Sequence, residues 1–324
     1  MKIDTKNLVI SEPKIQSRLY GYKDYFNNFI SIHKKNKLPN MMLLSGPKGS
    51  GKATFAYHFI NYLLSNGEEN KYSIENFEIS ANNSSFKLIQ NRIHPNFFLL
   101  ENILSDENIK IDQIRNLLRF LSKSNYSKDL KIVLLDNAEF LNLNSSNALL
   151  KALEEPSKNT HFFIIHNDSS AIADTIKSRC LQFKFHFNIA EKKNIFSEIV
   201  QNYKLTFNEN DLDKFLYFET PGNLLRYLVA LNGSNFDISR DNLSCILFLI
   251  DKYKIKKDPE LLNLISLLIE NFYNELSLND ASNVNYYFRN KNKISHLISD
   301  MKKFNQDKKN LLISIHEILK NETQ

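Results

Sequence analysis

Residues 131–180 alternate between short apolar runs and a helical segment, and this alternation limits the fold more than any other feature of the chain. The runs KIVLL (131–135) and THFFII (160–165) have the near-continuous apolar character of strands that are buried on both faces. Between them, NSSNALLKALEEPS has apolar residues at helical spacing, and Pro156 ends the helix. This order predicts a parallel sheet covered by helices, with Asp136 at the C-terminal tip of its strand.

In the segment that follows, we expect a short helix, IADTIKSRC, and then a strand, LQFKFHF. Arg179 lies at the end of this helix, where its side chain could reach a neighbouring molecule. An ordinary surface or ion-pairing arginine is the plainer alternative. Cys180 has no histidine beside it in the motif and begins a strand, so we expect a small buried residue rather than a reactive thiol.

The composition is that of an ordinary globular protein. The chain has 324 residues, 42% of them apolar and 24% charged, which is enough for two or three domains with their own cores. The net charge of +6 permits contact with nucleic acid, but the lysines are spread along the chain, as on a solvated surface. Cys180 and Cys245 have no paired spacing, so neither a disulfide framework nor a zinc site is expected. The chain begins without an apolar signal region and has no run of transmembrane length, so we expect a cytoplasmic protein without a membrane partner.

A glycine-rich loop, GPKGSGKAT (46–54), follows the apolar run MMLL and precedes a segment with helical periodicity. In this context backbone N–H groups and a helix N-terminus surround phosphate oxygens, and the lysine adds a point charge. In the usual pattern the residue after the lysine is Ser or Thr, and its hydroxyl group ligates Mg²⁺. Here Ala53 occupies that position. Thr54 comes one residue later, so its side chain points about 100° away around the helix. The candidate nucleotide-binding residues are therefore those of a degenerate loop together with one acidic residue: Gly46, Gly49, Gly51, Lys52, Ala53, Thr54 and Asp136.

The rest of the chain is predicted to form strands and helices except for one stretch. Residues 66–92 are polar, rich in Asn and Ser and poorly periodic, which indicates a surface segment. Helices are expected at 22–33, 109–124, 191–201, 210–218 and 222–231, a strand at 94–101, and helices throughout from residue 242. The helices of the C-terminal part each have an apolar face, but this part contains no group of residues that would suggest catalysis. The apolar faces therefore form either a core or an interface with a partner.

Five stretches within about residues 19–230 carry a family resemblance: LLSGPKGSGKA, HPNFFLLE, IDQIRNLL, IVLLDNAEFLNLNSSNALLKALEEPSKNTHFFII and DTIKSRCLQFKF. Together they resemble the delta-prime subunits of the bacterial DNA polymerase III clamp loader, which are AAA+ proteins. The resemblance implies an α/β fold followed by an all-α part. It implies an AAA+ P-loop core with a parallel sheet at 1–185, a small lid of three helices at 186–235, and a helical collar, or oligomerisation domain, at 236–324.

The resemblance also assigns roles to single residues. Lys52 matches the phosphate-binding lysine, and Asp136 matches the metal-site aspartate of the second phosphate motif. Active members follow that aspartate with Glu, which activates water, but here the residue is Asn137, an amide with no basicity. The lid position of a phosphate-sensing arginine falls on Gly222. Arg179 in SRC matches an arginine finger that reaches the ATP of the adjacent subunit, where a guanidinium stabilises the charge that develops in phosphoryl transfer.

These features favour a delta-prime subunit, or stator, that helps to load the sliding clamp onto DNA during replication and has no ATPase activity alone. The partners that the resemblance implies are the gamma/tau and delta subunits, the sliding clamp and, through the complex, primer–template DNA. The alternatives are an autonomous AAA+ ATPase of the gamma/tau kind and a P-loop nucleotide kinase, which the long helical tail disfavours. The sequence leaves open whether ATP, ADP or no nucleotide occupies the degenerate loop.

Overall fold

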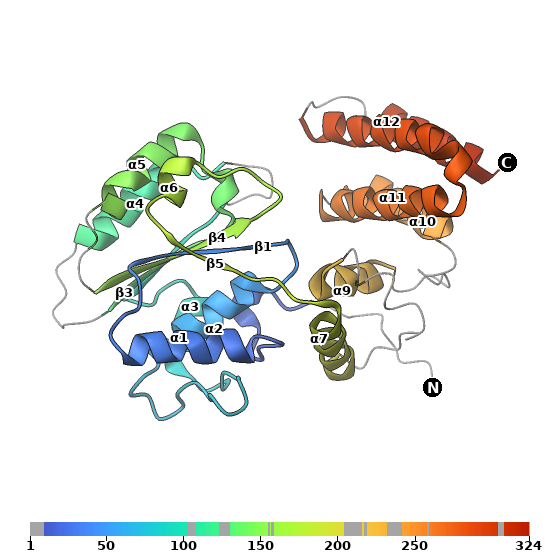
Figure 1. Cartoon of the computed structure of the whole chain (residues 1–324). Coiled ribbons are helices and arrows are strands. Elements are labelled where there is room, and N and C mark those ends of the chain that lie inside the picture. The colour runs from blue at the N-terminus through green and yellow to red at the C-terminus, as the bar shows by residue number, and fades with distance from the viewer. Residues whose placement is uncertain are drawn as a thin grey trace. The chain divides into compact units, whose positions relative to one another are not determined.

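The computed structural model divides the chain into two compact units (Figure 1). One unit consists of Ser11–Asn202 with Thr220–Gly222, and the other consists of the remaining residues. The glycine loop and Arg179 both belong to the first unit. The structure describes residues 10–102, 108–122, 130–154, 156, 159–203, 216, 219–231, 242–257, 259–303 and 308–323.

A five-stranded parallel sheet forms the centre of the first unit. Its strands are β1 (Met41–Gly46), β2 (Phe97–Leu100), β3 (Lys131–Leu135), β4 (Thr160–Asn167) and β5 (Leu181–Lys184), in the spatial order β2-β3-β4-β1-β5. All neighbouring pairs are parallel, and Leu44 of β1, for example, lies between Ile165 of β4 and Phe183 of β5. Parallel strands end at the same edge of a sheet, and ligands of such folds bind at that edge. The glycine loop after β1 and Asp136 after β3 therefore lie at the same edge, and the predicted parallel sheet is confirmed.

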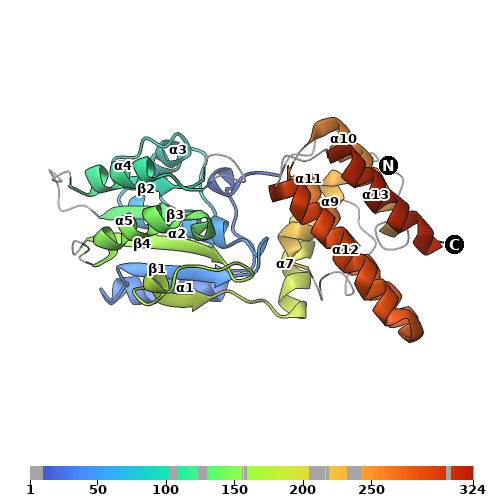
Figure 2. The ribbon, with the colours of Figure 1, turned by 90° about the horizontal axis from the view of Figure 1, so that it is seen from above.

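Helices cover both faces of this sheet (Figures 1 and 2). One face is covered by α1 (Lys23–Lys34), α2 (Lys52–Leu64) and α3 (Ser84–Gln90), and the other by α4 (Ile111–Ser122), α5 (Leu143–Glu154) and α6 (Asp174–Lys177). α7 (Ile189–Asn202) follows β5. The helices predicted at 22–33, 109–124 and 191–201 are confirmed, with described ends that differ by one to two residues. Residues 123 and 124 of the second prediction lie outside the described part of the chain.

Side chains along each strand alternate between two cores. In β1, Met42 and Leu44 pack into the core beneath α1 and α2, whereas Leu43 packs into the core beneath α4 and α5. Because both faces are covered, the central strands β3 and β4 are apolar along most of their length, as in the sequence runs that predicted them. The first core is aromatic, with many edge-to-face ring contacts: Tyr22, Phe26, Phe29, Phe55, Phe59 and Phe185.

The prediction of a polar surface segment at 66–92 is wrong. This stretch contains α3 and several buried apolar side chains, namely Tyr72, Phe77, Ile79, Phe86 and Ile89. Local polar contacts shape its turns: the Asn83 side chain accepts from the N–H of Phe86 (2.6 Å), and the Glu68 carboxylate accepts from the N–H of Ser85 (3.0 Å). The apolar residues therefore reach the core at irregular intervals, which neither the helical nor the strand period detects.

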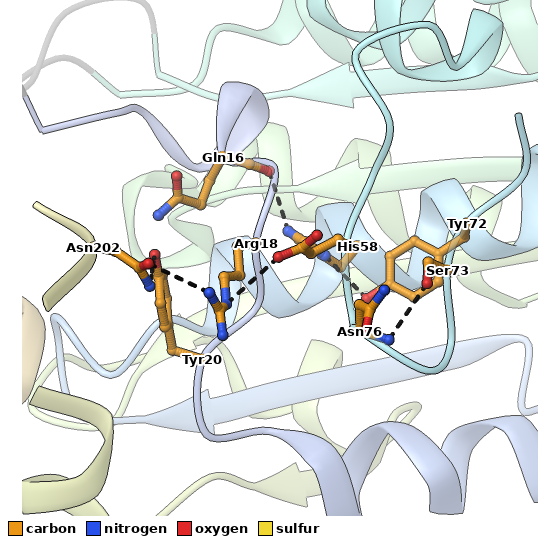
Figure 3. Close-up of polar contacts among 9 residues, drawn as sticks. Gln16, Arg18, Tyr20, His58, Tyr72, Ser73, Asn76 and Asn202 are labelled. Carbon is orange, nitrogen blue, oxygen red and sulfur yellow. Dashed lines mark hydrogen bonds and ion pairs between the residues drawn. The ribbon is translucent and has the colours of Figure 1, made fainter. Parts of the chain in front are cut away.

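The segment before α1 is tied to the core by polar contacts (Figure 3). The buried ring of His58 lies between the carbonyl of Gln16 and the hydroxyl of Tyr72, 3.1 Å from each oxygen. Burial lowers the pKa of His58 to about 3, so the ring is neutral at physiological pH. Since a carbonyl can only accept, Nε2 donates to Gln16 and Nδ1 accepts from Tyr72. Arg18 donates to the Asn202 side chain at the end of α7 (3.3 Å), so the chain is fixed where it enters α1.

The regular elements in the described part of the second unit are helices. They are α9 (Pro221–Ala230), whose first two residues belong to the first unit, α10 (Asn242–Lys256), α11 (Pro259–Asn279), α12 (Val284–Lys303) and α13 (Lys308–Lys320), with short 3₁₀ turns at Ala281–Asn283 and Asn321–Thr323. Neighbouring helices from α10 to α13 pack on one another through buried side chains such as Leu249, Ile265, Ile294 and Ile315. The helical pattern predicted from residue 242 is confirmed.

Two predictions about the lid have different outcomes. The helix predicted at 222–231 is observed as α9. The helix predicted at 210–218 lies almost entirely outside the described residues. The domain boundaries after residues 185 and 235 stay predictions. Among the described helices, none is long and apolar enough to cross a membrane.

Candidate functional site

The glycine loop joins the end of β1 to the start of α2. Gly49 and Gly51 have φ angles of 81° and 92°, a conformation that residues with a side chain rarely adopt. Position 46 leaves no room for a side chain, because a Cβ atom there would lie 2.4 Å from the carbonyl oxygen of Phe185. Gly51 is also the N-cap of α2, so the loop leads directly into a helix N-terminus.

The carbonyl groups of residues 46–50 all accept hydrogen bonds from the protein. The donors are Lys52 Nζ to Gly46 and Pro47 (2.7 Å each), Thr220 Oγ1 to Lys48 (2.9 Å), the N–H of Gly222 to Gly49 (3.1 Å) and the Tyr22 hydroxyl to Ser50 (2.9 Å). A trans peptide directs its C=O and its N–H to opposite sides. These contacts therefore also fix where the N–H groups of the loop point, and the loop is held in shape by its own chain.

The start of α9 approaches the loop more closely than a side chain would allow. A Cβ at Gly222 would lie 2.4 Å from the carbonyl oxygen of Gly49. Thr220, which is buried, donates to the preceding carbonyl of the loop. The resemblance places a phosphate-sensing arginine at Gly222, and in the structure this glycine makes a close backbone contact instead.

Lys52 is the buried charge of the loop, with only 6% of its surface exposed. Burial lowers the pKa of its ammonium group to about 8, against the attraction of Asp168, Glu139 and Asp136, which raise it. Both hydrogen bonds of this group go to carbonyls of the loop itself. A phosphate group in the loop would therefore compete with these carbonyls for the lysine.

Asp136 follows β3 at the C-terminal edge of the sheet, as the sequence predicts. Burial and the nearby Glu101 raise the pKa of its carboxyl group to about 6, although the N–H of Asn137 and the Lys52 ammonium group favour the charged form. Asn137 has a φ of 56°, and its side-chain amide donates to the Asn102 side chain (3.1 Å). An amide has no basicity, so Asn137 cannot activate water for attack.

The first turn of α2 contains the last two predicted loop residues. Ala53 packs against the aromatic core and offers only a methyl group, and Thr54 is half-buried. Mg²⁺ binds oxygen ligands. A phosphate-binding site of this type supplies a carboxylate, here Asp136, and a Ser or Thr hydroxyl after the lysine, which Ala53 lacks. The loop amides, Lys52 and the N-terminus of α2 fit an anion such as a phosphate group. The residues thus fit a phosphate group better than they fit Mg²⁺.

Replacing Asp136 by asparagine is expected to stabilise the protein above pH 6. The folded carboxyl has a pKa of about 6, above its ordinary value of 3.8, so the folded state binds this proton more tightly than the unfolded state does. The resulting stability is complete below about pH 4 and is lost as the pH rises through 6. We expect urea unfolding to show a gain of about 1–2 kcal/mol at pH 8 and little change at pH 4. Equal effects at both pH values would contradict the raised pKa.

Arg179 lies between α6 and β5, at the surface of the first unit. In its guanidinium group, Nη2 pairs with Oε1 of Glu154 at the end of α5 (2.9 Å), and Nη1 donates to the carbonyl of Thr175 (2.9 Å). The side chain is 34% exposed. The structure therefore presents Arg179 at the end of the short helix, as predicted, with an ion-pair partner that the sequence did not indicate.

Cys180, beside this arginine, is a packing residue. It is half-buried and contacts the core beneath α4 and α5. Burial raises the pKa of its thiol to about 11, so the thiolate, which is the reactive form, is scarce at neutral pH. The sequence predicts a small buried residue here, and the structure shows Cys180 half-buried, packed against the core but not enclosed by it.

Three residues that shape the site were not predicted as site residues from the sequence. Tyr22 is buried against the aromatic core and donates to the glycine loop, Thr220 donates to the loop from just before α9, and Glu154 pairs with Arg179. Glu154 lies in a stretch quoted for the family resemblance, and Thr220 directly precedes the Pro–Gly that begins a predicted helix. Their spacing in sequence gives no sign of the partners, which are brought together by the fold.

This arrangement, with a phosphate-type loop after β1, an aspartate after β3 and a covered parallel sheet, defines a protein of the AAA+ class. The family described as "DNA polymerase III, delta subunit" matches residues 21–188, just over half of the chain. The chain therefore belongs to the delta-prime family of bacterial clamp-loader subunits.

Curated relatives include delta' subunits of DNA polymerase III. The chain is 36% identical to DNA polymerase III subunit delta' of Pseudomonas aeruginosa over 140 residues, which are 43% of this chain and 41% of that protein. It is 29% identical to subunit delta' of Bacillus subtilis over 187 residues, 57% of this chain and 50% of that protein. The chain thus spans half or less of the length of these two relatives. Among solved structures, it is similar to a gamma subunit-related protein of Thermotoga maritima, with 15% identity, a TM-score of 0.44, and coverage of 91% of this chain and 99% of that one.

Proposed function

We propose that this chain is the stator subunit of a bacterial clamp loader, and that it donates Arg179 to ATP bound by a neighbouring subunit. Its partners in this assembly are gamma/tau and delta subunits. The assembly as a whole acts on the sliding clamp and on primer–template DNA. Membership in the delta-prime family supports the proposal.

The observation that carries the proposal is an asymmetry within the first unit. Two parts that hydrolysis by the chain itself would need are replaced, at Ala53 and Asn137, whereas Arg179 is present on an exposed turn. An arginine that acts on the ATP of a neighbour needs no Mg²⁺ ligand and no base from its own chain. This combination is expected of a subunit that serves the reaction of its neighbour.

The chemistry of Arg179 suits that role. A guanidinium group is charged at every physiological pH and presents a planar fork of N–H donors to phosphate oxygens. Negative charge spreads over the oxygens of the transferred phosphoryl group in the transition state, so donors placed there stabilise the transition state more than the ground state. Arg179 would supply this stabilisation without exchanging a proton.

The glycine loop, in this proposal, keeps its shape without a nucleotide. Protein donors already satisfy the carbonyls of residues 46–50, and Lys52 is one of those donors. A bound ATP or ADP would be held through its phosphates by the loop amides. It would not be hydrolysed there, because the hydroxyl ligand and the basic residue are missing at Ala53 and Asn137.

We propose that helices α10–α13 join the chain to the other subunits. Exposed apolar side chains gather in sequence around the turn between α11 and α12: Leu278, Val284, Tyr286 and Phe288. Exposed apolar groups of this kind mark interaction surfaces when they form a patch.

The isolated chain is expected to hydrolyse ATP negligibly, and Lys52→Ala should not change its rate. The physical reason is the missing Mg²⁺ ligand and base, which no other motif residue replaces. A steady-state ATPase assay on both proteins checks this. A rate of about 1 s⁻¹ or more, in the ordinary range for enzymes, that disappeared in Lys52→Ala would support an autonomous ATPase instead.

The role of Arg179 is tested in the assembled complex. The clamp- and DNA-stimulated ATPase rate is measured with reconstituted complexes that contain either this chain or its Arg179→Ala variant. A lower rate with the variant, at equal assembly, supports the proposal. An equal rate would leave the chain as a structural subunit only.

A further inference from the structure

The end of α5 and the end of α6 are linked by one ion pair. Glu154, the last residue of α5, places Oε1 2.9 Å from Nη2 of Arg179, although the two residues are 25 positions apart in the sequence. The second contact of the guanidinium group, from Nη1 to the carbonyl of Thr175, comes from α6 itself. The arginine is therefore held from two elements, on two different nitrogens.

The exposure of the pair indicates what it does. The side chains are 34% exposed for Arg179 and 52% for Glu154, and ion pairs in such contact with water add little to the stability of a fold. The pair does, however, restrict a long side chain that would otherwise sample many rotamers. Its main physical effect is therefore on the orientation of the guanidinium group.

We propose that Glu154 is a positioning residue for Arg179, an inference that rests on the proposed role of Arg179 at a neighbouring nucleotide. A guanidinium group has five N–H donors. The contacts with Glu154 and Thr175 use one hydrogen on each of two nitrogens. Three donors, including Nε–H, are not used by these contacts, and they suffice for a two-point contact with phosphate oxygens.

Holding the arginine in advance reduces the ordering that must occur when the neighbour's ATP approaches. A long side chain loses conformational entropy when it is immobilised at an interface, and this loss offsets part of the free energy gained from its contacts. Without Glu154 the guanidinium group would keep its contact with Thr175 only, or lose both. We therefore expect the Glu154→Ala complex to hydrolyse ATP about 3–10-fold more slowly at this interface.

The test uses reconstituted complexes that contain the full chain. Glu154→Ala should lower kcat of the stimulated ATPase, while the KM for ATP at the intact sites of the partner subunits stays the same. Glu154→Gln keeps an oxygen that accepts from Nη2, so it should retain at least half of the rate. The matched control is Glu69→Ala, which removes an exposed glutamate outside α5 and α6 and should have no effect.

A double-mutant cycle shows whether Glu154 acts through the arginine. In the Arg179→Ala background, Glu154→Ala should cause no further loss, because the group that it positions is gone. An additive loss, or an unchanged or higher rate in Glu154→Ala when Arg179→Ala is impaired, would overturn the positioning role. If Arg179→Ala itself had no effect, the proposed function would fail first, and this inference with it.

Discussion

Replacing Arg179 by alanine is expected to lower ATP hydrolysis at one interface of the reconstituted clamp loader by about 10³-fold. The guanidinium group would be lost from the site where charge develops on the transferred phosphoryl group. The stimulated rate of the whole complex should fall by the share that this interface contributes. Folding and assembly should be nearly unchanged, since the contacts of Arg179 with Glu154 and Thr175 lie at the surface.

Two further variants make this result specific. Arg179→Lys should recover little of the rate, because an ammonium group cannot reproduce the planar fork of donors. Arg115→Ala serves as the matched control: Arg115 is exposed on α4 and pairs with Asp112 (2.8 Å), in the same unit but on another helix. A rate that fell equally in Arg115→Ala would point to a general loss of surface charge and not to a finger.

Replacing Gly222 by alanine is expected to destabilise the first unit by about 2–3 kcal/mol, in the upper part of the usual range of about 1–3 kcal/mol for overpacking. The added Cβ would lie 2.4 Å from the carbonyl oxygen of Gly49, so backbone must move against backbone. The hydrogen bond from the N–H of Gly222 to the same oxygen would be stretched. Intrinsic helix propensity predicts the opposite sign, because alanine in a helix is favoured over glycine by about 1 kcal/mol.

Urea unfolding of the full chain measures this effect. Ser295→Ala, at an exposed position of α12, is the control for an alanine that meets no close neighbour, and it should change stability by less than about 0.5 kcal/mol. Stability that rose in Gly222→Ala would show that propensity dominates and that the contact between α9 and the glycine loop is not tight.

The sequence predicted the central sheet well because its signals are local. Runs such as KIVLL and THFFII are almost continuously apolar, and this property is typical of strands covered on both faces, whatever the rest of the chain does. The glycine loop was found by the same kind of local signal: Gly49 and Gly51 do adopt the positive φ angles that the motif requires. Asp136 followed from its place at the end of a strand.

The parts that were not predicted depend on contacts between distant segments. The carbonyls of the glycine loop are satisfied from Tyr22, Thr220 and Gly222, and no local pattern connects these residues to the loop. Gly222 was interpreted only as the absence of an arginine, whereas the structure shows a glycine that the close contact requires. The segment 66–92 was misjudged for a related reason, since its buried residues are set by irregular turns and not by a period.

We propose that this chain serves the nucleotide of a neighbour and does not hydrolyse one of its own. The most direct measurement compares the stimulated ATPase rates of three complexes, containing the unaltered chain, Arg179→Ala or Lys52→Ala, after equal assembly has been established. We expect a full rate with Lys52→Ala and a reduced rate with Arg179→Ala. A full rate with Arg179→Ala and a reduced rate with Lys52→Ala would contradict it.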